Sequence, residues 1–150
     1  MLPIIILAGG YGTRLGKLTE NTPKCMVEIF GIPFLEYQIN LLKQSGFDNI
    51  IICLGHFQEK VIKYLAKYPE IRYTIDNQSL GTGGAIKKAI QIYNLDRFFV
   101  IYGDSYLRSD YKAIENKYLS KNNSSLMVIH KNENKKDITT HHFSSCSVYS

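Results

Sequence analysis

Residues 9–14 place three glycines, a threonine and an arginine directly after a short apolar run, a composition suited to phosphate binding. The glycines Gly9, Gly10 and Gly12 allow a tight backbone turn, and closely spaced N–H groups in such a turn can bind an anion. Arg14 adds a planar guanidinium whose N–H groups match phosphate oxygens. The segment therefore predicts a phosphate-binding loop, and the alternative is a plain turn between a strand and a loop.

Two better-known phosphate-binding motifs do not match this segment. The P-loop spacing would require a glycine where Tyr11 stands and a hydroxyl residue where Leu18 stands, which disfavours a kinase or a GTPase. The dinucleotide fingerprint Gly-x-Gly-x-x-Gly fits Gly10 and Gly12, but Leu15 occupies the place of the third glycine. The loop is therefore of another kind.

Residues 7–15 (LAGGYGTRL) and 23–27 (PKCMV) together resemble the two-part signature of the sugar-phosphate nucleotidyltransferases, the NDP-sugar pyrophosphorylases. This resemblance covers residues 3 to about 137 and implies that the glycine loop wraps the triphosphate of an NTP. It also implies that Arg14 and Lys24 neutralise phosphates at the reacting centre, whereas a lysine by itself is more often a solvated surface residue. The substrate-binding residues that we predict on this basis are Leu7, Ala8, Gly9, Gly10, Gly12, Thr13, Asp76, Gly81 and Thr82.

The resemblance also implies a reaction. A sugar 1-phosphate oxygen would attack the α-phosphorus of the NTP, and pyrophosphate would leave. Because the attacking phosphate is already anionic, this chemistry needs positioning and charge neutralisation and no general base. Residues 80–84 (LGTGG) are most similar to heptose and mannose 1-phosphate guanylyltransferases, whereas residues 22–24 and 34–37 also resemble phosphocholine cytidylyltransferases.

Asp104 follows the apolar run 98–102, and Gly103 lets the chain bend so that the carboxylate can leave the strand. Its simplest role would be to cap the turn that follows. Beside a triphosphate, a carboxylate suits Mg²⁺, which takes one or two carboxylates together with phosphate oxygens and water. Since the resemblance assigns the metal aspartate to this position, we predict Arg14, Lys24 and Asp104 as catalytic residues, with Asp104 as the Mg²⁺ ligand.

Asp76 stands before the second glycine-rich stretch and could either form an Asx-type turn or recognise the base. A carboxylate can accept two hydrogen bonds from adjacent donors. Guanine offers such a pair in its ring N–H and its exocyclic amine, whereas uracil and thymine offer one donor between two carbonyls. We therefore expect GTP to be the NTP.

These candidates must be positioned by the elements around them. Apolar runs predict strands at residues 4–7, 49–54, 71–75, 98–102 and 125–130. Apolar periodicity predicts helices at 58–68, 85–93 and 111–119, and one between Pro33 and Gly46 with Phe34, Tyr37, Leu41 and Leu42 on its inner face. Residues 15–27 are expected to be irregular and residues 76–84 to form a loop.

Strands and helices alternate with short connections, which predicts an α/β fold. We expect a Rossmann-like, mostly parallel sheet with helices on both faces, and the resemblance implies the nucleotide-diphospho-sugar transferase type. Ligands of such sheets bind at the carboxyl ends of the strands, where the glycine loop, Asp76 and Asp104 should meet.

Composition narrows the function classes. The chain has 150 residues, 45% hydrophobic and 21% charged, which is ordinary for one globular domain. The net charge of +5 suits a phosphate-rich substrate, and no Lys/Arg run favours nucleic acid. No apolar stretch approaches the roughly 20 residues of a membrane helix, and the N-terminus lacks secretory features. We expect a cytoplasmic protein that binds an NTP and a sugar 1-phosphate but neither nucleic acid nor membrane, with Cys25, Cys53 and Cys146 as free thiols.

Residues 138–150 contain no Lys, Arg, Asp or Glu and follow the charged segment 131–137. We interpret residues 1–137 as the NTP-binding nucleotidyltransferase domain and residues 138–150 as an atypical tail, disordered or out of frame. The resemblance implies that relatives continue with a sugar pocket and a second metal carboxylate, so the chain would be truncated at its C-terminus. The alternative function is thus a catalytically weak or inactive nucleotide-binding protein, and unpaired strand edges would favour a homo-oligomer.

Overall fold

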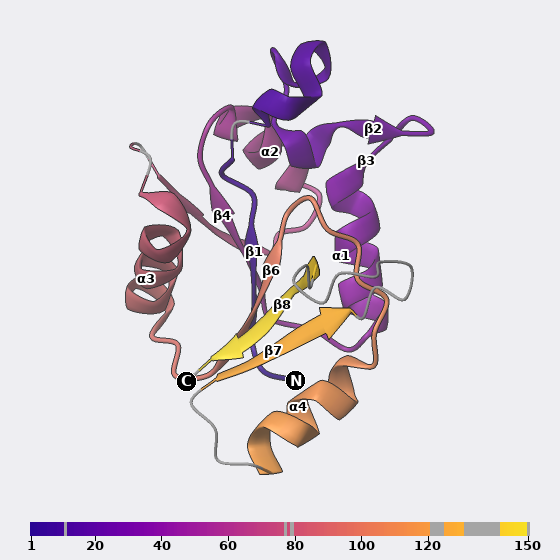
Figure 1. Ribbon diagram of the computed structural model, residues 1–150. Coiled ribbons are helices and arrows are strands. Elements are labelled where there is room, and N and C mark those ends of the chain that lie inside the picture. The colour runs from indigo at the N-terminus through magenta and orange to yellow at the C-terminus, as the bar shows by residue number, and fades with distance from the viewer. Residues whose placement is uncertain (11, 77, 79, 121–124, 131–141, 150) are drawn as a thin grey trace.

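The computed structural model describes residues 1–10, 12–76, 78, 80–120, 125–130 and 142–149 (Figure 1). The centre of the described structure is a six-stranded sheet with the strand order β5-β4-β1-β6-β8-β7. The strands are β1 (Ile4–Leu7), β4 (Ile50–Leu54), β5 (Arg72–Ile75), β6 (Phe98–Tyr102), β7 (Ser125–His130) and β8 (His142–Tyr149). β5, β4, β1 and β6 pair in parallel, whereas β8 runs antiparallel to both of its neighbours. The predicted mostly parallel sheet is confirmed.

Helices cover both faces of this sheet, as predicted. They are α1 (Phe34–Gln44), α2 (Gln58–Leu65), α3 (Gly81–Tyr93) and α4 (Tyr111–Ser120). Ile4 and Ile6 of β1 belong to a core that includes buried residues of α1, α2 and α4, whereas Ile5 packs in a second core with α3. Because β1 is buried on both faces, its sequence is a continuous apolar run without polar alternation.

Three local predictions differ from the structure. The inner face of α1 consists of Leu35, Gln38, Ile39 and Leu42, so only Leu42 was placed correctly. Periodicity allows several apolar stripes on this helix, and its docking on the sheet selects among them. The helix α3 begins at Gly81, four residues before the predicted start, so the expected loop 76–84 is shorter. The predicted irregular stretch 15–27 contains two 3₁₀ helices, η1 (Thr13–Thr19) and η2 (Lys24–Met26), and a two-stranded hairpin follows, β2 (Glu28–Ile29) and β3 (Ile32–Pro33).

The expected disorder of residues 138–150 is not what the structure has at residues 142–149. These residues form β8, which lies between β6 and β7 and pairs with both. Val148 is 0% exposed and belongs to the main core. Backbone pairing on two sides needs no charged side chains, and this explains how a charge-free segment can hold a place inside the sheet. Residues 138–141 and Ser150 lie outside the described residues.

The carboxylate of Glu36 links α1 to α2 and to the segment that follows α2, because three donors from these parts contact it. Glu36 of α1 accepts hydrogen bonds from the hydroxyl groups of Tyr64 and Tyr68, and Lys67 Nζ lies 2.7 Å from its Oε2. Lys67 Nζ also lies 4.0 Å from the centroid of the Tyr64 ring. Burial by itself would raise the pKa of Glu36, but the hydrogen bonds from Lys67, Tyr64 and Tyr68 outweigh it and lower the pKa to about 2.

Glu36→Gln is expected to lower the free energy of unfolding by about 2 kcal/mol at neutral pH, because a charged acceptor becomes a neutral amide. The pKa of Glu36 is lower in the folded protein, about 2, than its ordinary value of 4.5. The stabilisation is therefore complete above about pH 4.5 and is lost as the pH falls towards 2. Urea unfolding across this range measures the difference, with the exposed Glu20→Gln as the matched control. A difference that stays constant down to low pH would contradict this assignment.

Among the described residues, no helix is both long enough and apolar enough to span a bilayer.

Candidate active site

Three loops that carry predicted site residues follow β1, β5 and β6, and β4 lies between β1 and β5 in the sheet. These strands are parallel neighbours, so their carboxyl ends lie along one edge of the sheet. Gly9 follows β1, Asp76 follows β5 and Asp104 follows β6. The structure therefore brings together at one edge the three segments that are far apart in the sequence.

A pocket of about 530 Å³ opens at this edge, between the glycine loop and the start of α3. Six of the predicted substrate-binding residues line it: Leu7, Gly9, Gly10, Asp76, Gly81 and Thr82. Residues of β4 and of the segment after it also line the pocket and were not predicted, among them Cys53, Gly55, His56, Phe57, Gln58 and Glu59. Their only sequence signal was a glycine after a buried strand, at a position that the predicted topology assigned to the same edge.

Position 55 requires a glycine because its backbone lies against the backbone of Gly9. A Cβ on Gly55 would lie 2.7 Å from the Gly9 carbonyl oxygen and 3.0 Å from Gly9 Cα. The N–H of Ala8 donates to the carbonyl of Cys53 at 2.9 Å and continues the pairing of β1 with β4. The end of β4 thus supports the glycine loop directly, and Ala8 itself is buried.

The second half of the glycine loop is held by Thr19. Gly12 has a φ of +66° and no room for a side chain, since a Cβ would lie 3.0 Å from Thr19 Cγ2 and 3.2 Å from Lys24 Cβ. Thr19 is 5% exposed, and its hydroxyl donates to the carbonyl of Gly12 at 2.9 Å. Thr13 and Arg14 open η1 directly after this turn, and their side chains lie outside the described part of the structure.

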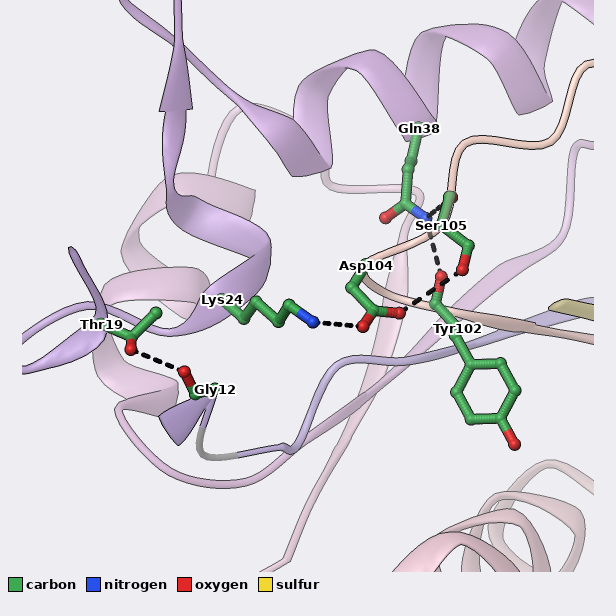
Figure 2. A network of polar contacts seen from close by, with 7 residues as sticks. All are labelled: Gly12, Thr19, Lys24, Gln38, Tyr102, Asp104 and Ser105. Carbon is green, nitrogen blue, oxygen red and sulfur yellow. Dashed lines mark hydrogen bonds and ion pairs between the residues drawn. The ribbon is translucent and has the colours of Figure 1, made fainter. Parts of the chain in front are cut away.

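Lys24 and Asp104 form an ion pair in which Lys24 Nζ lies 2.5 Å from Asp104 Oδ2 (Figure 2). Lys24 belongs to η2, which begins after the extended Pro23, and Asp104 stands two residues beyond β6. Both side chains remain accessible, at 35% and 40% exposure. The two residues are 80 positions apart in the sequence, and the fold places a cation and an anion of the predicted catalytic set in direct contact.

Asp76 lines the pocket at the end of β5. Its backbone N–H donates to the carbonyl of Leu54 at 2.9 Å, which fixes it against β4. Lys88 Nζ lies 3.4 Å from Asp76 Oδ1 and donates a hydrogen bond to the carbonyl of Ile75. The Asp76 side chain is only 10% exposed, so its charge is compensated by Lys88 rather than by bulk water.

The described residues contain no group of three or more His, Cys, Asp or Glu side chains that could hold a metal ion. Asp104 nevertheless fits Mg²⁺, because this ion can take a single accessible carboxylate and complete its octahedron with phosphate oxygens and water. Cys25 and Cys53 are free and buried, and burial raises the pKa of their thiols to about 12 and about 11. Neither thiol is therefore an activated nucleophile.

A family model described as "Nucleotidyl transferase" matches residues 4–138. The chain is 35% identical over 119 residues to D-glycero-alpha-D-manno-heptose 1-phosphate guanylyltransferase from Aneurinibacillus thermoaerophilus. This match covers 77% of this chain and 52% of that protein. The chain is 37% identical over 103 residues to choline-phosphate cytidylyltransferase from Streptococcus pneumoniae, covering 69% and 44% respectively. The crystal structure of HddC from Yersinia pseudotuberculosis complexed with GMP-PN has a TM-score of 0.81 at 28% identity, over 100% of this chain and 77% of that one.

The chain thus spans about half the length of the curated relatives that it matches.

Proposed function

This chain belongs to the nucleotidyl transferase family, and from that membership we propose that it transfers GMP from GTP to a sugar 1-phosphate and releases pyrophosphate. One observation carries the proposal. The pocket lined by the glycine loop, Asp76 and the start of α3 lies on the same sheet edge as the ion pair of Lys24 and Asp104. A nucleotide with its base in the pocket could extend its phosphates along this edge towards the paired charges.

Different residues along this edge of the sheet would bind different parts of the substrates. The backbone around Gly9, Gly10 and Gly12 would hold the triphosphate, since closely spaced N–H groups bind anions. Lys24 would leave its ion pair to meet a phosphate of the NTP, as a compact cation on a flexible stem. Arg14, at the start of η1, would add a second positive charge. These positive charges would bring two anionic substrates together, and the repulsion between those anions is the main barrier to this transfer.

Asp104 is the residue that would hold Mg²⁺. A bound Mg²⁺ supplies positive charge that stabilises the phosphate oxygens during the transfer. Asp104 is accessible and pairs with one cation, the ammonium group of Lys24. Its carboxylate therefore lies in a place where positive charge is favoured.

The preference for guanine rests on Asp76 and on the relatives. Asp76 lines the pocket with a largely buried carboxylate that can accept two adjacent hydrogen bonds. Relatives that match the chain include proteins named as heptose and mannose 1-phosphate guanylyltransferases. Guanine offers the two adjacent donors that such a carboxylate requires.

Asp76→Asn is expected to reduce the discrimination between GTP and UTP by about 10-fold to 100-fold, because an amide presents one acceptor where the carboxylate presents two. The ratio of kcat/KM for the two nucleotides measures the effect, and each nucleotide serves as the control for the other. A loss that is equal for both nucleotides would mean that Asp76 supports the pocket without recognising the base.

The experiment that tests the whole proposal measures pyrophosphate release from GTP, CTP, UTP and dTTP with Mg²⁺ and a panel of sugar 1-phosphates. Release with GTP alone supports the guanylyltransferase. Release with another NTP keeps the transferase and rejects the role of Asp76 in base recognition. Nucleotide binding without release supports the alternative of an inactive nucleotide-binding protein.

A second candidate is phosphocholine cytidylyltransferase activity. It is favoured by the 37% identity to the cytidylyltransferase from Streptococcus pneumoniae. Adding CTP with phosphocholine to the same panel distinguishes the two reactions, because a guanylyltransferase would release no pyrophosphate from that pair.

A further inference from the structure

The four residues Tyr102–Ser105 form a tight turn that carries Asp104 out of the sheet. The N–H of Ser105 donates to the carbonyl of Tyr102 at 3.2 Å, and the N–H of Gly103 donates to the carbonyl of Leu7 at 2.8 Å. A Cβ on Gly103 would lie 2.8 Å from the same Leu7 oxygen. One side of the turn is therefore fixed against the end of β1, from which the glycine loop starts.

The other side of the turn is held by Gln38, which reaches it from α1 (Figure 2). The side-chain amide nitrogen Nε2 donates to the carbonyl of Tyr102 at 2.9 Å and to the carbonyl of Ser105 at 2.6 Å. Both hydrogens of one NH₂ group thus bridge the first and last carbonyls of the turn. The opposite orientation of the amide would place its oxygen against two carbonyl oxygens, so the chemistry of the contacts requires the nitrogen here.

A glutamine at position 38 is unfavourable for the stability of the folded protein. It is 1% exposed and shares its face of α1 with Leu35, Ile39 and Leu42, which are all buried and apolar. Its oxygen Oε1 is buried and accepts no hydrogen bond from the described residues. An unpaired buried acceptor lowers stability, and a leucine would fit the apolar face without that cost. The benefit of the amide therefore lies in the turn that it holds rather than in the packing of the helix.

We propose that Gln38 is a positioning residue that holds the carboxylate of Asp104 in fixed register with the glycine loop. Asp104 lies between the two carbonyls that Gln38 bridges, and its carboxylate contacts two groups near the surface, Lys24 Nζ at 2.5 Å and Ser105 Oγ at 3.4 Å. This inference rests on the proposed function, in which Asp104 holds the metal. It adds a residue of α1, distant from the glycine loop in the sequence, to those on which the transfer depends.

Gln38→Leu tests the proposal, with Gln44→Leu as the matched control on the exposed end of the same helix. We expect Gln38→Leu to lower kcat for pyrophosphate release at least about tenfold and to raise the Mg²⁺ concentration for half-maximal rate at least about threefold. The Kd of GTP without metal should stay within about twofold of wild type, because no residue of this turn lines the pocket. Gln44→Leu should leave all three quantities unchanged. An unchanged kcat, or an equal loss of metal-free GTP binding, would overturn the positioning role.

Gln38→Glu adds a readout that a merely structural role would not move. A protonated carboxyl group can donate one hydrogen bond to the turn, whereas a carboxylate can donate none. The activity of this variant relative to wild type is therefore expected to rise as the pH falls from about 8 to about 6. A pH-independent ratio would contradict the proposed contact.

Hydrogen exchange separates a failure of this inference from a failure of the proposed function, because it needs neither ligand nor turnover. If wild type releases no pyrophosphate with any substrate of the panel, the proposed function fails. In that case, the hydrogen-exchange rates of the backbone amides of Gly103 and Ser105 test the role of Gln38. Exchange in Gln38→Leu that is at least about tenfold faster than in wild type supports the clamp on the turn, and unchanged exchange overturns it.

Discussion

Asp104→Asn is expected to lower the rate of pyrophosphate release by about 100-fold or more, since it removes the charge that would bind Mg²⁺. The ion pair with Lys24 contributes little to folding, because both side chains are more than a third exposed and surface pairs are weak. The variant should therefore fold as wild type does, and its loss of activity would report on chemistry.

The measurement is pyrophosphate release under saturating substrates and metal, together with the melting temperature. Asp96→Asn is the matched control, because Asp96 is 92% exposed and pairs only loosely with Arg97 at 3.8 Å. We expect this control to keep full activity. An Asp104→Asn variant with at least half of wild-type activity would remove Asp104 from the catalytic set.

Gly103→Ala is expected to lower the free energy of unfolding by about 2 kcal/mol, because the added methyl group meets backbone atoms that have no room to move. A Cβ on Gly103 would lie 2.8 Å from the Leu7 oxygen and 3.0 Å from Ala8 Cα. These atoms belong to the end of β1 and the start of the glycine loop, at the centre of the sheet. The activity should fall as well, because the turn that carries Asp104 must shift.

Urea unfolding followed by circular dichroism measures this loss. Gly83→Ala adds the same methyl group at an exposed position of α3, where no described atom outside the helix backbone lies within 4 Å of it. Because alanine favours helix over glycine, we expect this control to gain up to about 1 kcal/mol. Equal stability of Gly103→Ala and wild type would show that the strand ends can separate without cost.

The order and type of the main elements followed from local sequence patterns. The strands 98–102 and 125–130 were predicted with the bounds that the structure has, because their apolar runs are bounded by polar or turn residues. The strand 142–149 was missed, since its weak periodicity resembles that of a tail. Its place between β6 and β7 depends on backbone pairing with strands that lie elsewhere in the chain, which no local pattern encodes.

Some residues of the candidate site could likewise be found from local sequence patterns, and others could not. Glycine patterns and carboxylates at strand ends led to Gly9, Asp76 and Asp104 without any structure, because parallel strands bring such ends to one edge. Gln38 and Phe57 had no such signal, since one stands in an apolar helix face and the other in a short turn after β4.

The sequence by itself thus determined the α/β fold, the edge of the sheet where the candidate site residues meet and the family to which the chain belongs. Only the tertiary structure decided that Lys24 meets Asp104, that Lys88 compensates Asp76 and that Gln38 holds the turn at Tyr102–Ser105. The physical reason is that apolar periodicity and glycine placement are local properties of the chain. Contacts between side chains depend on how helices dock on the sheet, and that docking is set by the packing of both cores together.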